Sequence, residues 1–242
     1  MTASHEQVRY TAGGVPVYSF LNPALHGFCL SLCVRAGSMF ETEEENGISH
    51  FLEHLAIRNV NARWEGELYR FLDRKGLNLN ACTYREYVQF TITGATAHFL
   101  EAADVLTQVM APLVLSSEEI VIERNRIKAE IREDGEENTL HCYALRAVWE
   151  GTSLERTIAG KPGGLNRMGK QILSQAHARF FSAGNVFFYV TGHTSERNLA
   201  ALCRYADRFP LTEGVPIRKN IAPLPAGFRA RDAQVIFRAR PN

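Results

Sequence analysis

Strands are predicted where apolar residues fall at every second position, because such a segment has one face to bury and one to expose. This alternation occurs in Val8–Tyr10, Val15–Phe20, Gly27–Ala36 and Leu77–Phe90, and it is clearest in the overlapping segment Val88–Thr93. Asn185–Thr191 is an apolar run rich in residues that favour strands. Gly13 and Gly14 separate the first two segments, so we expect these to form a hairpin.

Helices are predicted where apolar residues recur at spacings of three and four. The segments are Ser49–Ile57, Trp64–Lys75, His98–Met110, Ser116 toward Gly135, Thr139–Trp149, Gln171–Phe181 and Glu196–Phe209, with a turn at Asn59–Asn61. Ser116 and Glu119 form an S-x-x-E capping box at the start of the longest helix. Strand pairs separated by helix pairs predict an α+β fold, in which a mostly antiparallel sheet is covered by helices.

Residues 1–210 contain all of these segments and are expected to form one domain. Residues 211–232 are rich in proline and are predicted to be a linker. One more strand-like segment, Ala233–Ala239, falls within residues 233–242. We interpret residues 233–242 as the start of a further strand or a second half that this sequence does not contain.

Composition excludes several classes of function. The 242 residues are 45% hydrophobic and 22% charged with a formal net charge of +1, so neither nucleic acid nor an anionic membrane is an expected partner. No apolar run reaches the roughly 18–20 residues that span a bilayer, and the N-terminus lacks the pattern of a signal peptide. The five cysteines are an odd number, which favours reduced thiols and a cytoplasmic protein.

The candidate chemistry centres on the segment His50-Phe51-Leu52-Glu53-His54. On a helix the two imidazoles share one face, and Glu53 lies beside that face. Two neutral imidazoles suit Zn²⁺, and Glu53 could then act as a general base on a metal-bound water. The order H-x-x-E-H is the inverzincin pattern. The alternative is a polar helix face without a metal, and the acidic run Glu41–Glu45 before it is expected to be a solvated loop.

A third ligand is required, because a catalytic zinc normally has three protein ligands and one open position. Four residues of the long helix share one face, because they lie 0, 4, 7 and 11 positions from the first of them. They are Glu123, Ile127, Glu130 and Asp134. Two acids a heptad apart on a partly apolar stripe suit a metal ligand and its outer partner. The alternative is a solvated acidic face, and spacing alone does not choose between Glu123 and Glu130.

Several segments together resemble the M16 peptidases, a family that includes pitrilysin, insulin-degrading enzyme and the mitochondrial processing peptidases. Gly47–His54 is similar to the active-site helix of that family, and Glu123–Ile131 is similar to its downstream glutamate helix. The matching segments elsewhere are Arg35–Ser38 with Glu41, Ile158–Gly160 and Phe187–Gly192. The resemblance implies the metallohydrolase fold shared with LuxS and the mitochondrial processing peptidases. It also implies one Zn²⁺ per chain held by His50, His54 and Glu130, with Glu123 as the acid behind these ligands.

The same resemblance implies a peptide substrate and a second chain. Leu79–Glu86 resembles the N-A-x-T-x-x-E strand of the family, so we expect Asn80, Ala81 and Thr83 to bind an extended peptide. In the family a second, similarly folded half completes the site. The resemblance therefore predicts the N-terminal catalytic half of a zinc endopeptidase for short or unfolded peptides. This half is either a fragment of a longer chain, or works with an M16-like partner chain, or works as a homodimer. The alternative is a non-catalytic M16-like subunit that serves as a binding or scaffold partner.

Two further points concern the zinc helix and its metal. Ile57-Arg58-Asn59-Val60 stands where members of the family often have an F-x-G-T stretch, which affects the expected loop shape and specificity but not the ligands. A purely structural zinc would need a fourth protein ligand. Cys82 and Cys142 are candidates by residue type, and no spacing supports either of them.

Overall fold

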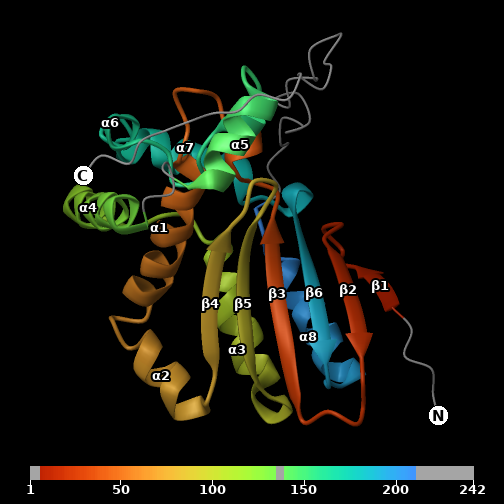
Figure 1. Ribbon diagram of the computed structural model, residues 1–242. Coiled ribbons are helices and arrows are strands. Elements are labelled where there is room, and N and C mark those ends of the chain that lie inside the picture. Colours follow the sequence, from red (N-terminus) through yellow and green to blue (C-terminus); the bar gives the residue numbers. More distant parts are fainter. Residues whose placement is uncertain (1–5, 135–138, 211–242) are drawn as a thin grey trace.

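One six-stranded sheet is the frame of the computed structural model, which describes residues 6–134 and 139–210 (Figure 1). The strands lie in the order β1-β2-β6-β3-β5-β4, and every pair of neighbours is antiparallel except β2 and β6. Their bounds are β1 (Glu6–Tyr10), β2 (Pro16–Leu21), β3 (Gly27–Val34), β4 (Asn78–Thr83), β5 (Val88–Ala95) and β6 (Val186–Gly192). The predicted α+β fold with a mostly antiparallel sheet is therefore confirmed, including the hairpin of β1 and β2.

The hydrophobic core lies on one face of the sheet. Two helices, α3 (Phe99–Thr107) and α8 (Glu196–Ala206), lie across it (Figure 1). Phe99 of α3 packs against Phe28 of β3 with ring centroids 5.0 Å apart. The side chains that point into this core are fully buried and include Leu30, Leu32, Phe90, Ile92, Phe188 and Val190. The alternation that predicted the strands therefore reflects the burial of one face.

The other α-helices of the described residues gather at the β4 edge of the sheet and at one end of it (Figure 1). They are α1 (Ile48–Arg63), α2 (Leu68–Lys75), α4 (Ser117–Asp134), α5 (Leu140–Trp149), α6 (Pro162–Leu165) and α7 (Lys170–Phe180). α1 passes beside the edge strand β4, and α4 lies next to α1. No helix in the described ranges is both long and apolar enough to cross a membrane.

α1 is longer than predicted, because Asn59–Asn61 is helical and not a turn. Asn59 is buried within the helix, and its side chain forms hydrogen bonds to the backbone of a segment far along the chain. Its Nδ2 donates to the carbonyl oxygen of Pro112 at 3.1 Å, and its Oδ1 accepts from the backbone N–H of Val114 at 2.8 Å. The turn falls instead at Glu65–Gly66, where φ is positive, so α2 begins later than predicted.

The predicted linker, residues 211–232, and the predicted further strand in residues 233–242 lie outside the described residues. They stay predictions, as does the domain boundary at residue 210.

Candidate metal centre

A buried carboxylate from the preceding loop binds the N-terminus of α1. Glu41 is 2% exposed, and its oxygens accept hydrogen bonds from the backbone N–H groups of Gly47 at 2.8 Å and Ser49 at 2.9 Å. The first N–H groups of a helix have no partner within the helix, so this carboxylate satisfies them and faces the positive end of the helix dipole. Burial raises the pKa of Glu41, and these hydrogen bonds act in the opposite direction. The prediction of a solvated loop is therefore wrong for Glu41.

A second loop contacts the same end of α1 through two glycines. Gly160 has a φ of +74°, and a Cβ atom there would lie 2.3 Å from the carbonyl oxygen of Asn46. Gly47 has a φ of +96°, and its Cβ would lie 2.6 Å from the carbonyl oxygen of Ala159. Only glycine fits a left-handed backbone at such close approach. The Asn46 side chain also donates to the carbonyl oxygen of Thr157 at 2.8 Å, so the two loops fix where α1 begins.

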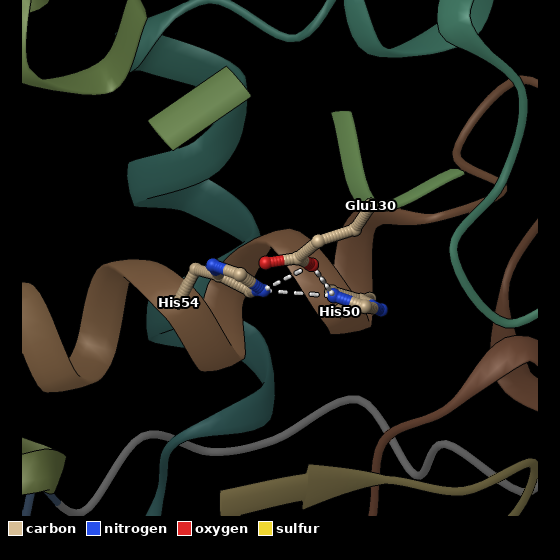
Figure 2. Close-up of side chains that lie close together, drawn as sticks. All are labelled: His50, His54 and Glu130. Carbon is tan, nitrogen blue, oxygen red and sulfur yellow. Dashed lines mark hydrogen bonds and ion pairs between the residues drawn. The ribbon is translucent and has the colours of Figure 1, made fainter. Parts of the chain in front are cut away.

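His50, His54 and Glu130 converge on one point between α1 and α4, as Figure 2 shows. The two Nε2 atoms are 2.8 Å apart, and Oε2 of Glu130 lies 3.4 Å from His50 Nε2 and 3.2 Å from His54 Nε2. Ligand atoms about 2.0–2.1 Å from a tetrahedral zinc ion are about 3.3 Å from one another. The observed separations therefore suit a zinc ion.

Within residues 6–134 and 139–210, these three form the one group of His, Cys, Asp and Glu side chains close enough to hold a metal ion. Neither Cys82 nor Cys142 belongs to that group. The side chains of His50, His54 and Glu130 are 18%, 14% and 36% exposed, so the point between them is accessible to solvent. The donor set fits a metal with three protein ligands and one open position. The roles of the three residues as ligands stay predictions.

Glu123 lies behind His54 and not in the cluster itself. Its side chain is 3% exposed, its Oε2 is 3.4 Å from His54 Nδ1, and its Oε1 accepts a hydrogen bond from Arg58 at 2.7 Å. A carboxylate at the second ring nitrogen fixes the orientation and tautomer that a metal requires of an imidazole. In the structure, then, Glu130 faces both Nε2 atoms, whereas Glu123 faces the far side of one ring.

The charges of this cluster shift the pKa values of its members. Burial lowers the pKa of His54, but the hydrogen bond to Glu123 and the charge of Glu130 outweigh it and raise the pKa above its ordinary value. The hydrogen bond to His50 lowers the pKa of Glu130. Burial raises the pKa of Glu123, but His54 and Arg58 outweigh burial and lower it. Both carboxylates are therefore anionic near neutral pH, which favours a bound cation.

Glu53 lies beside the cluster and contacts strand β4. Thr83, a buried residue, donates from Oγ1 to Glu53 Oε2 at 2.5 Å. β4 is an edge strand, so in the described part of the chain its outer side has no strand neighbour. Asn80 is exposed on this strand and Ala81 is half-buried. The structure thus places Asn80 and Ala81 at the sheet edge next to α1, whereas the Thr83 side chain contacts Glu53, which the sequence did not predict.

Arg58 is a further residue of the site that sequence reasoning missed. It appeared only as a departure from the family pattern, yet it is the partner of Glu123. Its position four residues after His54 and eight after His50 places it on the ligand face of α1. That spacing, opposite an acidic helix, is the signal that could have found it.

The fold and the cluster define an α+β domain with a His-His-Glu centre, a donor set found in zinc peptidases. The family model described as Insulinase (Peptidase family M16) matches residues 22–162. This is more than half of the chain, and the chain therefore belongs to peptidase family M16. The resemblance predicted from the motifs is confirmed.

Curated relatives are similar to this chain over a part of their own length. YmxG of Bacillus subtilis (strain 168), described as an uncharacterized zinc protease, is 29% identical over 191 residues, which are 78% of this chain and 47% of that protein. Mitochondrial-processing peptidase subunit beta of Mus musculus is 25% identical over 186 residues, which are 76% of this chain and 38% of that protein. The chain thus spans less than half the length of these relatives, and they imply zinc as the metal of the family.

Solved structures show the same fold. A protease from Helicobacter pylori matches with a TM-score of 0.78 and 18% identity over 88% of this chain and 53% of that chain. The peptidase M16 inactive domain from Pseudomonas fluorescens matches with a TM-score of 0.76 and 16% identity over 87% of this chain and 52% of that chain. The expected M16 metallohydrolase fold is confirmed. Because one of these proteins is a protease and the other an inactive domain, the fold does not decide whether this chain is catalytic.

Proposed function

We propose that this chain is the zinc-binding catalytic half of an endopeptidase that cleaves short or unfolded peptides. The observation that carries the proposal is the convergence of His50, His54 and Glu130 on one accessible point. Glu53 directly precedes His54 on α1, and both residues line a cavity beside the cluster together with Arg58 and Glu123. The zinc-protease relatives support the choice of metal, and we propose one Zn²⁺ per chain.

Glu53 carries the proton in the proposed reaction. A bound zinc ion supplies Lewis acidity, which makes water a nucleophile near neutral pH and polarises a carbonyl group. Glu53 accepts a proton from water as the water oxygen bonds to the carbonyl carbon of the peptide. It then gives this proton to the leaving amine as the C–N bond breaks. His50, His54 and Glu130 hold the metal, while Glu123 fixes the orientation of His54.

The free edge of β4 is the proposed peptide-binding surface. An extended peptide can add to an edge strand through main-chain hydrogen bonds, with little dependence on its side chains. We assign this pairing to the main-chain groups of Ala81 and Thr83, which point away from β5, and assign a peptide contact to the exposed Asn80 side chain. Binding of this kind favours unfolded peptides, because the strands of a folded protein are already paired.

A second M16-like chain, either a different protein or a second copy of this one, is proposed to complete the peptide site. One of this chain's curated relatives, from Mus musculus, is named as a subunit of the mitochondrial-processing peptidase. In this proposal residues 1–210 are the catalytic domain and residues 211–232 a linker. A cytoplasmic location is proposed from the five cysteines, an odd number that favours reduced thiols and a reducing compartment.

The second candidate function is that of a non-catalytic M16 subunit, since the inactive domain from Pseudomonas fluorescens has this fold. The specific observation against it is that the chain keeps both histidines, the third ligand and the adjacent carboxylate. A subunit that only binds a partner needs none of these four groups.

Metal content and peptide cleavage of the purified chain test the proposal. We expect one equivalent of zinc per chain and its loss in His50→Ala. Glu53→Gln is expected to keep the zinc and to abolish cleavage of an unstructured fluorogenic peptide, measured with the chain alone and mixed with an M16-like partner. Glu44→Gln, an exposed acid in the loop before α1, is the control that should behave as the wild type. A chain without stoichiometric zinc, or equal cleavage by the wild type and Glu53→Gln, would contradict the proposal.

A further inference from the structure

The contact between Thr83 and Glu53 joins the edge strand to the zinc helix. The Thr83 hydroxyl donates to Glu53 Oε2 at 2.5 Å, a short hydrogen bond to a charged acceptor. In the described part of the chain, Thr83 is the one hydrogen-bond partner of the Glu53 carboxylate. One carboxylate oxygen is therefore held by the protein, and the other, Oε1, remains available to a reacting group.

The position of the Thr83 hydroxyl is fixed by the sheet and not by the site. Thr83 pairs with Val88 of β5, and the next residue, Tyr84, donates from its backbone N–H to the carbonyl oxygen of Tyr87 at 2.8 Å. Thr83 is on the same face of β4 as Ala81, which packs against the core. A β-branched side chain has few χ1 rotamers, so this backbone leaves the hydroxyl little freedom.

We propose that Thr83 is a positioning residue, whose hydroxyl holds the Glu53 carboxylate in the orientation needed for proton transfer. The inference rests on the proposed function and gives Thr83 a second role beside the main-chain pairing suggested above. Because the same residue belongs to the strand assigned to the peptide, the β4 edge sets the distance between the bound peptide and the carboxylate. Reacting groups tolerate little misplacement, so loss of the hydroxyl slows the chemical step without weakening peptide binding.

Matched variants of Thr83 separate this role from a structural one. Thr83→Val and Thr83→Ala remove the donor, whereas Thr83→Ser keeps it and loses only a methyl group. We expect the first two to lower kcat by about tenfold to a hundredfold with KM and zinc content unchanged, and Thr83→Ser to restore kcat to within about threefold. Thr93→Val, at an exposed position of the neighbouring strand β5, is the control and should behave as the wild type. Circular dichroism and the melting temperature identify the variants that fold, and only these are compared.

A readout without turnover distinguishes failure of this inference from failure of the proposed function. The visible absorption of the chain loaded with Co²⁺ alone reports the surroundings of the metal. Glu53→Gln and Thr83→Val should change the same band in the same direction, and Thr83→Ser and Thr93→Val should not. If no form cleaves peptide but the spectra follow this pattern, the proposed function fails and the positioning role stands. A Thr83→Val chain with wild-type kcat and a wild-type spectrum would overturn the inference, as would a loss of kcat that Thr83→Ser does not restore.

Discussion

Glu123 is charged although it is almost fully buried, and this is possible because both of its oxygens have cationic or donor partners. Arg58 binds one oxygen and His54 faces the other. Glu123→Gln keeps the shape but removes the charge that orients the imidazole. We expect zinc affinity to fall by about tenfold to a hundredfold, measured by competition with a chromophoric chelator. Glu133→Gln, an exposed acid on the same helix, should leave the affinity unchanged; an equal loss there would show a general charge effect and contradict the specific one.

His177 makes a second residue-scale prediction, this time about stability and pH. It is buried, its ring stacks on Phe181 with centroids 4.3 Å apart, and burial lowers its pKa to about 4. Above pH 6.5 the imidazole is neutral in both the folded and the unfolded chain. As the pH falls from 6.5 toward 4, the unfolded chain takes up a proton that the folded chain does not, so stability is lost. The loss is on the order of 3 kcal/mol when complete.

The measurement for His177 is the free energy of unfolding in urea at several pH values between 4 and 7. His177→Gln cannot take up this proton and should show a flatter dependence on pH in that window. His26→Gln, at an exposed histidine, should keep the wild-type slope. Equal slopes in His177→Gln and the wild type would show that other groups cause the acid sensitivity.

At the scale of the element, α1 depends on groups that lie outside it. Glu41 accepts hydrogen bonds from two N–H groups at the start of α1, those of Gly47 and Ser49. In Glu41→Gln these donors would face either an amide N–H₂ group or a weaker acceptor. We expect a loss of stability of about 1–3 kcal/mol in urea denaturation. Glu43→Gln, at an exposed acid of the same loop, should change stability by less than about 0.5 kcal/mol. If both variants lost the same amount, the cap would not be the cause.

The start of α1 also depends on the close approach of Gly160. Gly160→Ala would place a Cβ atom against the backbone of Asn46 at a left-handed φ, so either the loop or the helix end must move. We expect a loss of more than about 2 kcal/mol, together with weaker zinc binding. Gly163→Ala, three residues further on in helix α6, is the matched control, because its Cβ would meet no atom within 4 Å. Comparable melting temperatures for the two variants would contradict the packing argument.

Elements determined by local pattern were predictable, and those fixed by distant partners were not. The capping box is present, since Ser116 accepts from the N–H of Glu119 at 3.2 Å and donates its own N–H to the Glu119 carboxylate at 2.9 Å. Asn59 was mistaken for a turn residue because its partners, more than fifty positions away, satisfy it within a helix. Glu41 was assigned to solvent for the same reason, since an acidic run does not reveal that one member caps a helix.

The candidate site likewise has features that a local sequence pattern predicts and features that depend on distant partners. His50 and His54 are four residues apart in α1, and Glu123 and Glu130 are seven apart in α4. These spacings place possible metal-binding side chains on one face of each helix. Which acid faces the two Nε2 atoms depends on how α4 packs against α1, and this is a tertiary contact that no local pattern contains. The family resemblance named Glu130, and the structure places Glu130 beside both rings (Figure 2). The link from Thr83 to Glu53 is likewise absent from any local spacing, because sheet register creates it.

At the scale of the whole molecule, a metal ion at this centre would join two helices that are far apart in the chain. His50 and His54 come from α1, and Glu130 comes from α4, so an unfolded chain does not hold the three groups together. A metal that binds the folded state alone stabilises it by an amount that depends on the free metal concentration. Zinc at about 100 times its dissociation constant contributes about 2.7 kcal/mol.

This coupling predicts that chelation lowers the melting temperature of the whole domain and not only its activity. For a chain of this size each kcal/mol corresponds to about 2–4 °C, so removal of zinc from that concentration should lower the melting temperature by about 5–10 °C. Added zinc should restore it. His50→Ala should melt at one temperature with or without zinc, whereas His26→Gln, at an exposed histidine, should respond as the wild type does. A zinc-dependent shift of equal size in His50→Ala would place the stabilising metal elsewhere in the chain. No shift in the wild type would mean that the folded state does not bind zinc through this cluster.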